Sequence, residues 1–253
     1  MLWFETMLVA FSTYSALPMP QFAWNEKNMR YAICWFPVVG VVCSLGLLLW
    51  NFLCSYFALP SILFAAVAVC LPLLLTGGIH MDGYMDTVDA LASHQTRERM
   101  LEIMKDSGCG AFAAIYCGIY LLLDFGFLYA VYEMGRVDVL IPMYVLSRGC
   151  SALCAVTMPN ARKAGMLCAF TENVQKSKAV KVISVILAVT AIGTILYTPL
   201  LGSLEVLGAV LAMLWYRHMA KKNFGGVTGD TSGFFLQICE LVMVIAVWAG
   251  GLL

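Results

Sequence analysis

The sequence predicts an all-α, polytopic helical membrane protein with about seven transmembrane helices. We also expect an N-terminal re-entrant or interfacial segment and surface helices on the cytoplasmic side. Of the 253 residues, 62% are hydrophobic and only 12% are charged, whereas soluble domains carry about 25% charged residues. Apolar runs of membrane length recur along the chain, and the basic residues gather on alternate connections between them. No connection is long enough for a soluble domain, so residues 1–253 are expected to form a single integral-membrane domain.

The N-terminal residues 1–20 are ambiguous, because they suit a short span, a re-entrant hairpin or an interfacial helix. Pro18 and Pro20 end whichever of these forms. Seven apolar runs follow, and the ends of the second and the sixth are the least defined because these runs are short or interrupted by glycine. The expected spans are residues 31–58, 60–80, 109–132, 138–158, 180–202, 203–217 and 233–253.

Thirteen of the 15 Lys and Arg residues lie on connections that the span count places on one face of the membrane. By the positive-inside rule this face is cytoplasmic, which predicts a multi-pass protein of the bacterial cytoplasmic (inner) membrane. The opposite face has only Arg136, and Arg148 lies within a span. The thirteen are Lys27, Arg30, Arg97, Arg99, Lys105, Arg162, Lys163, Lys176, Lys178, Lys181, Arg217, Lys221 and Lys222.

The ten cysteines form no CxxC pair and show no Cys/His spacing typical of a metal site. We interpret them as small packing residues in a reducing compartment. The lipid bilayer is an expected partner, nucleic acid is not, and a homo-oligomer is left open.

The stretch GGIHMDGYMDTVDA, residues 77–90, follows directly on an apolar run and carries three carboxylates. If residues 81–92 are helical, Asp82, Asp86 and Asp89 fall within an arc of roughly 60° and His80 points away from them. Three like charges on one stripe repel each other unless a cation lies between them. Oxygen ligands suit Mg²⁺, which prefers one or two carboxylates together with substrate phosphates. The stretch therefore predicts a metal site completed by a phosphorylated ligand; the alternative is a solvated polar face on a surface helix.

A second motif, GGVTGDTSG at residues 225–233, has the composition of a phosphate cradle. Glycines give access to backbone N–H groups, threonines offer hydroxyls, and Asp230 is an acid able to hold a metal. Lys222 beside it adds positive charge, although the motif lacks the lysine of a P-loop. The alternative is a tight turn into a helix. The substrate-binding candidates in this motif are Gly225, Gly226, Thr228, Gly229 and Thr231.

Two further features bear on the site. The stretch RERMLEIMKDSGCG, residues 97–110, reads as an amphipathic helix on the cytoplasmic membrane surface, with Lys105 at its charged side. Arg148 lies in the middle of a span, where an ionisable residue is a functional-site hypothesis by default. We expect its partners to be the aspartates or a phosphate.

These motifs, in this order, resemble the cobalamin synthase family, adenosylcobinamide-GDP ribazoletransferase. The resemblance covers nearly the whole chain, and the pairing of GGxHxDGxxDxxD with GGxTGDT is its most specific part. Two departures are Ala16, where many relatives have arginine, and Ala90, where many have glycine. The motifs that carry the resemblance are STYSALPMP, FPVVG, GGIHMDGYMDTVDA, RERMLEIMKDSGCGAF, SR at 147–148, NARKAG and GGVTGDTSG with Glu240 following.

The resemblance implies a Mg²⁺-dependent enzyme that joins adenosylcobinamide-GDP to α-ribazole or its 5′-phosphate and releases GMP. On this reading Lys105, Arg148 and Lys222 neutralise phosphate oxygens, and Asp106 and Arg162 join the substrate-binding candidates. An acid such as Asp89, or His80, takes the proton of the attacking hydroxyl. The implied metal ligands are Asp82, Asp86, Asp89 and Asp230.

A shared diphosphate requires Asp230 to lie within about 10 Å of the 82–89 cluster. We expect both to face one cytoplasmic cavity, with Arg148 projecting into it, and the cavity to be larger than a nucleotide because a corrinoid must reach the same phosphorus.

Two other functions stay open on the sequence. A CDP-alcohol phosphotransferase-like enzyme also uses several aspartates, but its usual spacing is absent. A divalent-cation transporter requires acids at mid-depth in several spans, where the sequence suggests only Asp124 and Arg148.

Overall fold

The computed structural model describes residues 2–20, 29, 31–106, 108–172 and 174–253. Most of this part is helical, which confirms the predicted all-α class, and Asn160 and Val227 form an isolated β-bridge. Short 3₁₀ turns at Ala32–Trp35 and Val137–Leu140 precede α3 and α8. The helices are α1 (Leu2–Tyr14), α3 (Phe36–Tyr56), α4 (Ser61–Thr76), α5 (Ile79–Ala92), α6 (Arg97–Ile103), α7 (Ala111–Glu133), α8 (Met143–Thr157), α9 (Met166–Glu172), α10 (Lys176–Tyr197), α11 (Pro199–Phe224) and α12 (Gly229–Gly250).

Six helices in the described part are long and apolar enough to cross a membrane, namely α3, α7, α8, α10, α11 and α12, with α3 and α8 each extended by its 3₁₀ turn. The pair α4 and α5 would be a seventh span, but it is bent by 95°. The prediction of about seven spans is thus confirmed. The helix in the run expected at 60–80 ends at Thr76, where the chain bends. Gly77 and Gly78 both have positive φ angles, of 65° and 76°, a conformation that glycine adopts without strain. They end α4 and turn the chain into α5.

The boundary between α10 and α11 also differs from the expected division at residues 202 and 203. The two helices meet at Thr198, which is extended, and Pro199 occupies the first position of α11. Proline suits this position because its missing N–H would have no partner there. Hydropathy does not mark this boundary, because both helices are apolar around it.

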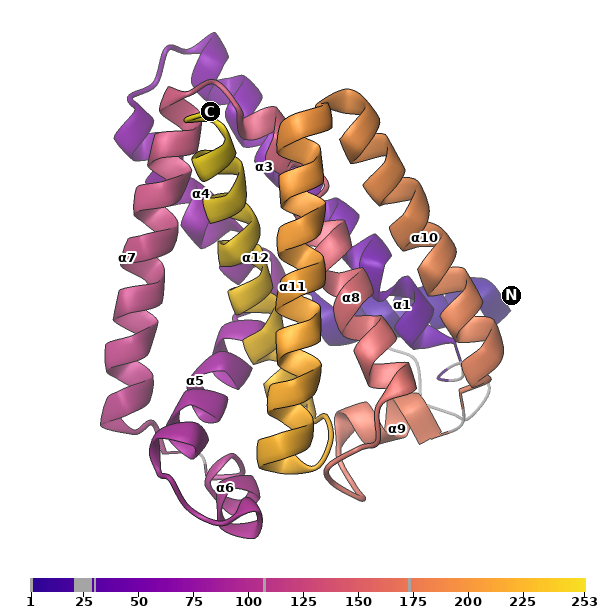
Figure 1. Cartoon of the computed structure of the whole chain (residues 1–253). Helices are drawn as coiled ribbons and strands as arrows, with labels where there is room; N and C mark the ends of the chain where they lie inside the picture. Colours follow the sequence, from indigo (N-terminus) through magenta and orange to yellow (C-terminus); the bar gives the residue numbers. More distant parts are fainter. Residues whose placement is uncertain (1, 21–28, 30, 107, 173) are drawn as a thin grey trace.

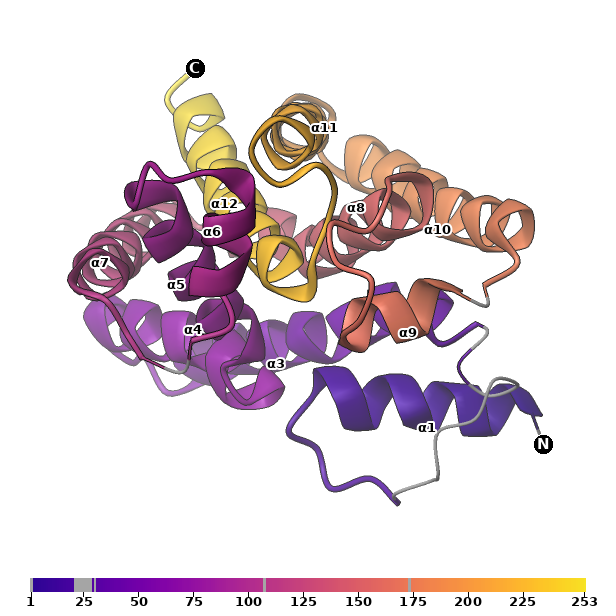
Figure 2. The same cartoon turned by 90° about the horizontal axis from the view of Figure 1, so that it is seen from below.

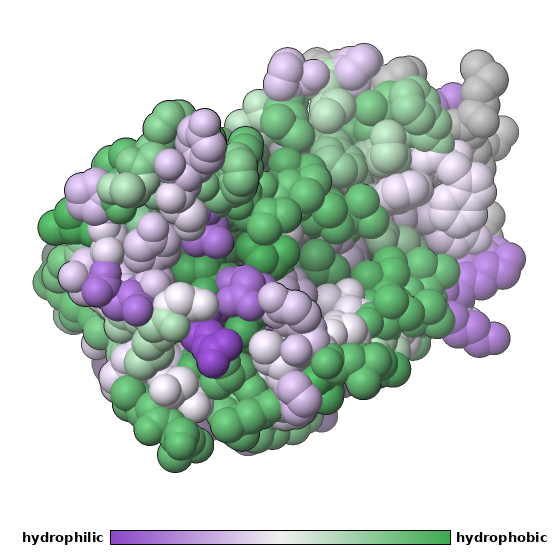
Figure 3. Space-filling model, turned by 90° about the horizontal axis from the view of Figure 1, so that it is seen from above, coloured by the Kyte–Doolittle hydropathy of each residue, from purple (hydrophilic) through white to green (hydrophobic). Residues whose placement is uncertain are grey.

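The bundle has two distinct ends (Figure 1). Helices α6 and α9 and the connection between α11 and α12 lie together at one end, which we call the site end. The basic connections 81–108, 159–181 and 217–232 therefore share one end, as the charge asymmetry predicted; Lys27 and Arg30 lie outside the described residues. Seen from the opposite end, hydrophobic side chains cover most of the surface (Figure 3).

Helix α1 lies across the bundle instead of along it (Figures 1 and 2). It has only 13 residues, fewer than a membrane-spanning helix needs. At its C-terminal end the ring of Tyr14 packs against Phe36 and Phe170, with centroid distances of 4.5 and 5.5 Å. This arrangement agrees with the expected re-entrant or interfacial segment and brings Tyr14 to the interior of the site end.

An ion pair holds α8 and α12 together in the interior. Arg148 Nη1 lies 2.8 Å from Glu240 Oε1, and the hydroxyl of Ser147 donates to the same oxygen at 2.7 Å. Arg148 is only 1% exposed. Removing one member of such a pair leaves an uncompensated buried charge, so the pair ties the two helices strongly.

Helices α5 and α12 meet backbone to backbone. A Cβ atom added at Gly83 would lie 2.8 Å from both Cα and O of Asp230, and one at Gly233 would lie 2.8 Å from O of His80. Helices approach this closely only where small residues face each other. The N-terminal turns of α5 and α12 are therefore in direct contact.

We predict that Gly83→Ala lowers the free energy of unfolding by about 1–3 kcal/mol, because the added methyl group overpacks this contact. Thermal unfolding of the purified protein in detergent micelles measures the effect. The control is Gly118→Ala in α7, where an added Cβ meets no atom within 4 Å; it should leave stability unchanged or raise it slightly. Equal stability of the two variants would show that α5 and α12 are not in such close contact.

Candidate functional site

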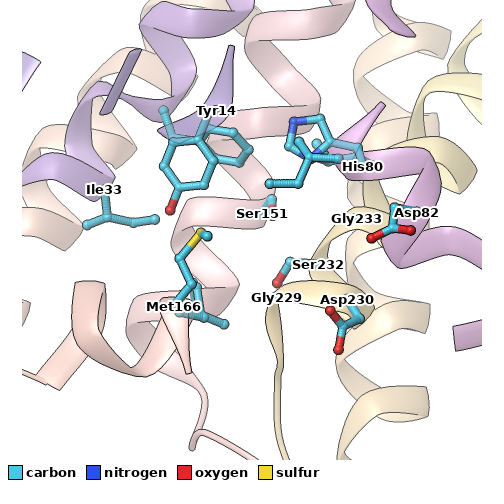
Figure 4. Close-up of a pocket in the computed structure, with 15 residues that line it drawn as sticks. Tyr14, Ile33, His80, Asp82, Ser151, Met166, Gly229, Asp230, Ser232 and Gly233 are labelled. Carbon is cyan, nitrogen blue, oxygen red and sulfur yellow. The ribbon is translucent and has the colours of Figure 1, made fainter. Parts of the chain in front are cut away.

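A cavity of about 250 Å³ opens among α1, α5, α8, α9 and α12, and Asp82 and Asp230 both line it (Figure 4). Asp82 comes from the first turn of α5 and Asp230 from the first turn of α12. The close contact between these two helices brings the carboxylates together although they are far apart in the sequence. The predicted juxtaposition of the 82–89 cluster and the 225–233 motif is therefore present.

The carboxylates form one electrostatic group. Residues 79–92 are helical, as predicted, and the charges of Asp82, Asp230 and Asp89 all act on Asp86. Within the described residues neither Asp82 nor Asp86 has a salt-bridge partner. An added cation would relieve their mutual repulsion.

Arg162 is the cation of this group. Its Nη1 lies 2.8 Å from Oδ2 of Asp230, and its Nη2 donates to the carbonyl of Leu101 at 3.1 Å. Arg162 and Asp230 are partly exposed, with side-chain exposures of 20% and 26%. A substrate-binding role was predicted for Arg162, and the structure places it beside the carboxylates.

Asp89 differs from its two neighbours on α5. Its Oδ2 accepts the N–H of Gly110 at 2.6 Å and its Oδ1 accepts the N–H of Ala113 at 2.8 Å. These groups belong to the start of α7, where unpaired N–H groups favour a carboxylate. Asp89 thus anchors α7 to α5, and this geometry lends no support to its predicted roles as metal ligand and proton acceptor.

The two glycines that open the 225–233 motif have structural tasks. Gly225 ends α11 with a φ of 79°, and a Cβ atom at Gly226 would collide with the carbonyl of Pro159. The lack of a side chain at Gly226 lets Val227 donate to Pro159 and accept from Ala161, each at 2.9 Å. This pairing holds the loop that carries Arg162 next to the start of α12.

Thr228 and Thr231 form a capping box at the start of α12. The hydroxyl of Thr228 accepts the N–H of Thr231 at 3.1 Å, and the hydroxyl of Thr231 accepts the N–H of Thr228 at 2.9 Å. Both side chains are buried. These hydroxyls complete the helix end. Thr228 also lines a small second hollow together with Arg162 and Asp230, and a contact of either hydroxyl with substrate stays a prediction. Gly229 does line the cavity, at the turn where a helix presents its unpaired N–H groups.

Arg148 does not project into the cavity, contrary to expectation, because Glu240 already neutralises it in the interior. Lys105, Asp106 and Lys222 are exposed, and none of them lines this cavity. Their predicted contacts with substrate stay predictions.

His80 lies at the inner side of the cavity. It is 7% exposed, its ring meets the ring of Phe36 edge-on at 5.6 Å, and its Nε2 has no hydrogen-bond partner among the described residues. Ser151 of α8 and Tyr14 of α1 line the same cavity. Sequence reasoning missed these two residues, since no local pattern links them to the aspartates.

One acid within the spans was overlooked, and another was noted only as part of the resemblance. Glu205 in α11 and Glu240 in α12 are both buried, as is the expected Asp124 in α7. The rule that singled out Arg148 would have found them. They meet one expectation of a transporter, yet none of the three lines the cavity, and Glu240 is paired. Among the described residues, no hydrogen bond or ion pair links these acids to the carboxylates of the site.

The size and the ligand set of the cavity bear on two further expectations. Its volume is below the range of about 300–1,000 Å³ typical of small-molecule sites, but two further hollows, of about 90 and 460 Å³, share lining residues with it. A cavity larger than a nucleotide stays a prediction. In the described part of the chain, no three His, Cys, Asp or Glu side chains are arranged to hold a metal ion by themselves.

Comparison with known proteins identifies the family. The sequence model of cobalamin-5-phosphate synthase matches residues 6–248. The chain is 40% identical to the adenosylcobinamide-GDP ribazoletransferase of Lachnoclostridium phytofermentans, over 98% of this chain and 94% of that protein. It is 31% identical to the enzyme of the same name from Acinetobacter baumannii, over 87% of this chain and 86% of that protein. No solved structure matches the chain. By sequence, therefore, the chain belongs to the cobalamin-5-phosphate synthase family.

Proposed function

We propose that this protein is an adenosylcobinamide-GDP ribazoletransferase, which joins adenosylcobinamide-GDP to α-ribazole or its 5′-phosphate and releases GMP. The relatives with this name support the activity. The observation that carries the proposal is the shared cavity of Asp82 and Asp230 at the start of α12. Carboxylates and helix N–H groups that meet at one point suit a diphosphate with its counter-ion.

We further propose Mg²⁺ as the cofactor, held by Asp82, Asp86 and Asp230. All donors are oxygens, and Mg²⁺ prefers one or two carboxylates completed by substrate phosphates. Within the described residues, the protein has no complete metal site without its substrate, which agrees with this preference. When bound, Mg²⁺ supplies positive charge to the diphosphate.

The residues of the chain position the reacting groups. The first turn of α12, opened by Gly229, directs N–H groups at the non-bridging oxygens, and Arg162 adds a guanidinium next to Asp230. The ribose hydroxyl attacks the phosphorus on the cobinamide side, its oxygen forms the new P–O bond, and the bond to GMP breaks. The hydroxyl proton passes to a carboxylate; because Asp89 is engaged with α7, Asp82 and Asp86 are the candidates.

The bulky parts of adenosylcobinamide-GDP must lie outside the cavity. A volume of about 250 Å³ cannot enclose a corrin macrocycle, so the corrinoid and the guanine extend from the mouth at the site end. The basic residues at this end support a cytosolic orientation in the bacterial inner membrane.

We predict that Asp82→Asn and Asp86→Asn each lower GMP release by at least about 100-fold, the size of effect expected when a transition-state charge contact is lost. Each change keeps the shape of the side chain, so the unfolding temperature should not fall. The control is Asp138→Asn, which lies at the opposite end of the bundle. If both variants release GMP at the parent rate in saturating Mg²⁺, the aspartates are only a solvated face. Release of CMP from a CDP-alcohol instead of GMP would favour the alternative enzyme class.

Asp89→Ala should behave differently from the other two aspartates. Loss of both N–H contacts at the start of α7 should lower the free energy of unfolding by about 0.5–2 kcal/mol, the range for removal of a helix cap. Chemical denaturation in micelles measures the change, and residual GMP release should exceed that of Asp82→Asn. A stable but inactive Asp89→Ala enzyme would instead restore the predicted catalytic role.

The orientation is testable with Cys109, which is exposed and lies before α7 at the site end. A membrane-impermeant maleimide should label Cys109 in inverted vesicles and not in right-side-out vesicles. In a variant without other exposed cysteines, Asp138→Cys at the opposite end should give the reverse pattern. Labelling of Cys109 from the periplasmic side would overturn the cytosolic site.

A further inference from the structure

We infer that the apolar side of the site cavity holds the two-ring aromatic base of the nucleoside substrate, and that His80 donates a hydrogen bond to the ring nitrogen of this base. The inference rests on the proposed function, because that function supplies the nucleoside. The inference divides the cavity into a reacting side, with Asp82 and Asp230, and a recognition side, with Tyr14, Ile33 and Met166.

The side chains of the cavity are segregated by polarity. Figure 4 shows Asp82 and Asp230 on one side, whereas Tyr14, Ile33 and Met166 lie on the other. The second group presents an aromatic ring, a branched aliphatic chain and a thioether, which suit a flat apolar ligand and not a phosphate. A nucleoside whose ribose hydroxyl lies at the carboxylates would place its base at this side.

The volume agrees with a base of two fused rings. An apolar cavity of about 150 Å³ is known to accommodate a single benzene ring. The 250 Å³ found here leaves room for a second ring.

His80 provides the polar contact of the recognition side. It is more than nine-tenths buried, and Nε2, with less than 1 Å² of accessible surface, lacks a partner among the described residues. A buried donor without a partner costs free energy, which a ligand reached by a small rotation of the ring would recover. In a benzimidazole base, the ring nitrogen that is not bonded to the ribose has an in-plane lone pair, which accepts such a bond. His80 and Asp82 are two residues apart on α5, so their side chains leave the helix in nearly opposite directions. They therefore contact different parts of one ligand. His80 is therefore a specificity-determining residue and not the acceptor of the hydroxyl proton.

Narrowing the cavity tests the location of the base. Ala155 lines it and is 3% exposed. In the full-length enzyme reconstituted in vesicles, Ala155→Leu should raise KM for α-ribazole at least about tenfold, the effect of a few methylene groups in a fitted pocket. KM for adenosylcobinamide-GDP should stay within about twofold, because the corrinoid and the guanine of that substrate lie at the mouth and not in the pocket that Ala155 lines. Ala114→Leu, an exposed position on α7, is the matched control and should change neither constant.

The nitrogen contact is tested with two nucleosides of the same shape, the benzimidazole riboside and the indole riboside that lacks the acceptor nitrogen. The parent enzyme should prefer the first by up to about tenfold in kcat/KM, the worth of one neutral hydrogen bond. His80→Phe should abolish this preference while kcat at saturation stays within a few-fold, and His80→Gln, which retains a donor, should keep part of it. A loss of kcat of about 100-fold for both nucleosides would instead identify His80 as the proton acceptor and overturn the inference.

The failures of the two proposals give different results. If the parent enzyme releases GMP but Ala155→Leu retains the parent KM for α-ribazole, the proposed function stands and the assigned pocket is wrong. If the parent releases no GMP, equilibrium binding of α-ribazole to the vesicles decides the pocket: weaker binding by Ala155→Leu than by Ala114→Leu supports it, and equal binding refutes it.

Discussion

The contact between the backbones of α5 and α12 is the constraint on which the rest of the site depends. Gly83 and Gly233 leave no side chain between the two helices, so the first turn of α12 lies directly against α5. Asp82 and Asp230 reach one cavity for this reason. Arg162 lies beside Asp230 because its loop forms a β-bridge, through Asn160, with Val227 just before α12. A larger residue at either glycine would push α5 and α12 apart. The carboxylates would then be separated, although none of them had been replaced.

The bend at Gly77 and Gly78 gives α5 its direction. Without it, the apolar run of α4 would continue straight and carry the aspartates away from the bundle. The bend turns α5 against α12, where its carboxylates meet a helix N-terminus instead of lipid. The buried charges of Arg148 and Glu240 neutralise each other between α8 and α12. One chain thus has a structural ion pair in its interior and a group of incompletely paired acids at the site end.

Several residues of the most distinctive motifs serve the fold, and this determines how the motifs should be interpreted. Asp89 caps α7, Thr228 and Thr231 cap α12, and Gly226 permits the pairing with Pro159. These contacts fix the ends of helices that converge on one cavity. A substitution there can abolish activity through the position of the helix ends without any loss of contact with substrate.

The sequence by itself determined the helical membrane class, the number of spans to within one, the shared end of the basic connections and the two motifs of the site. These features follow from hydrophobicity, charge and helical periodicity, which are local properties. It did not separate Asp89 from Asp82 and Asp86, because all three lie in the same register on α5 and only the position of α7 distinguishes them. It misdirected Arg148 for a similar reason: its partner Glu240 lies in another span, and pairing between spans leaves no local pattern. The lining of the cavity by Tyr14, Ser151 and His80, whose Nε2 has no partner among the described residues, was decided only by tertiary structure, because a cavity between helices is set by packing and not by the order of residues in any one of them.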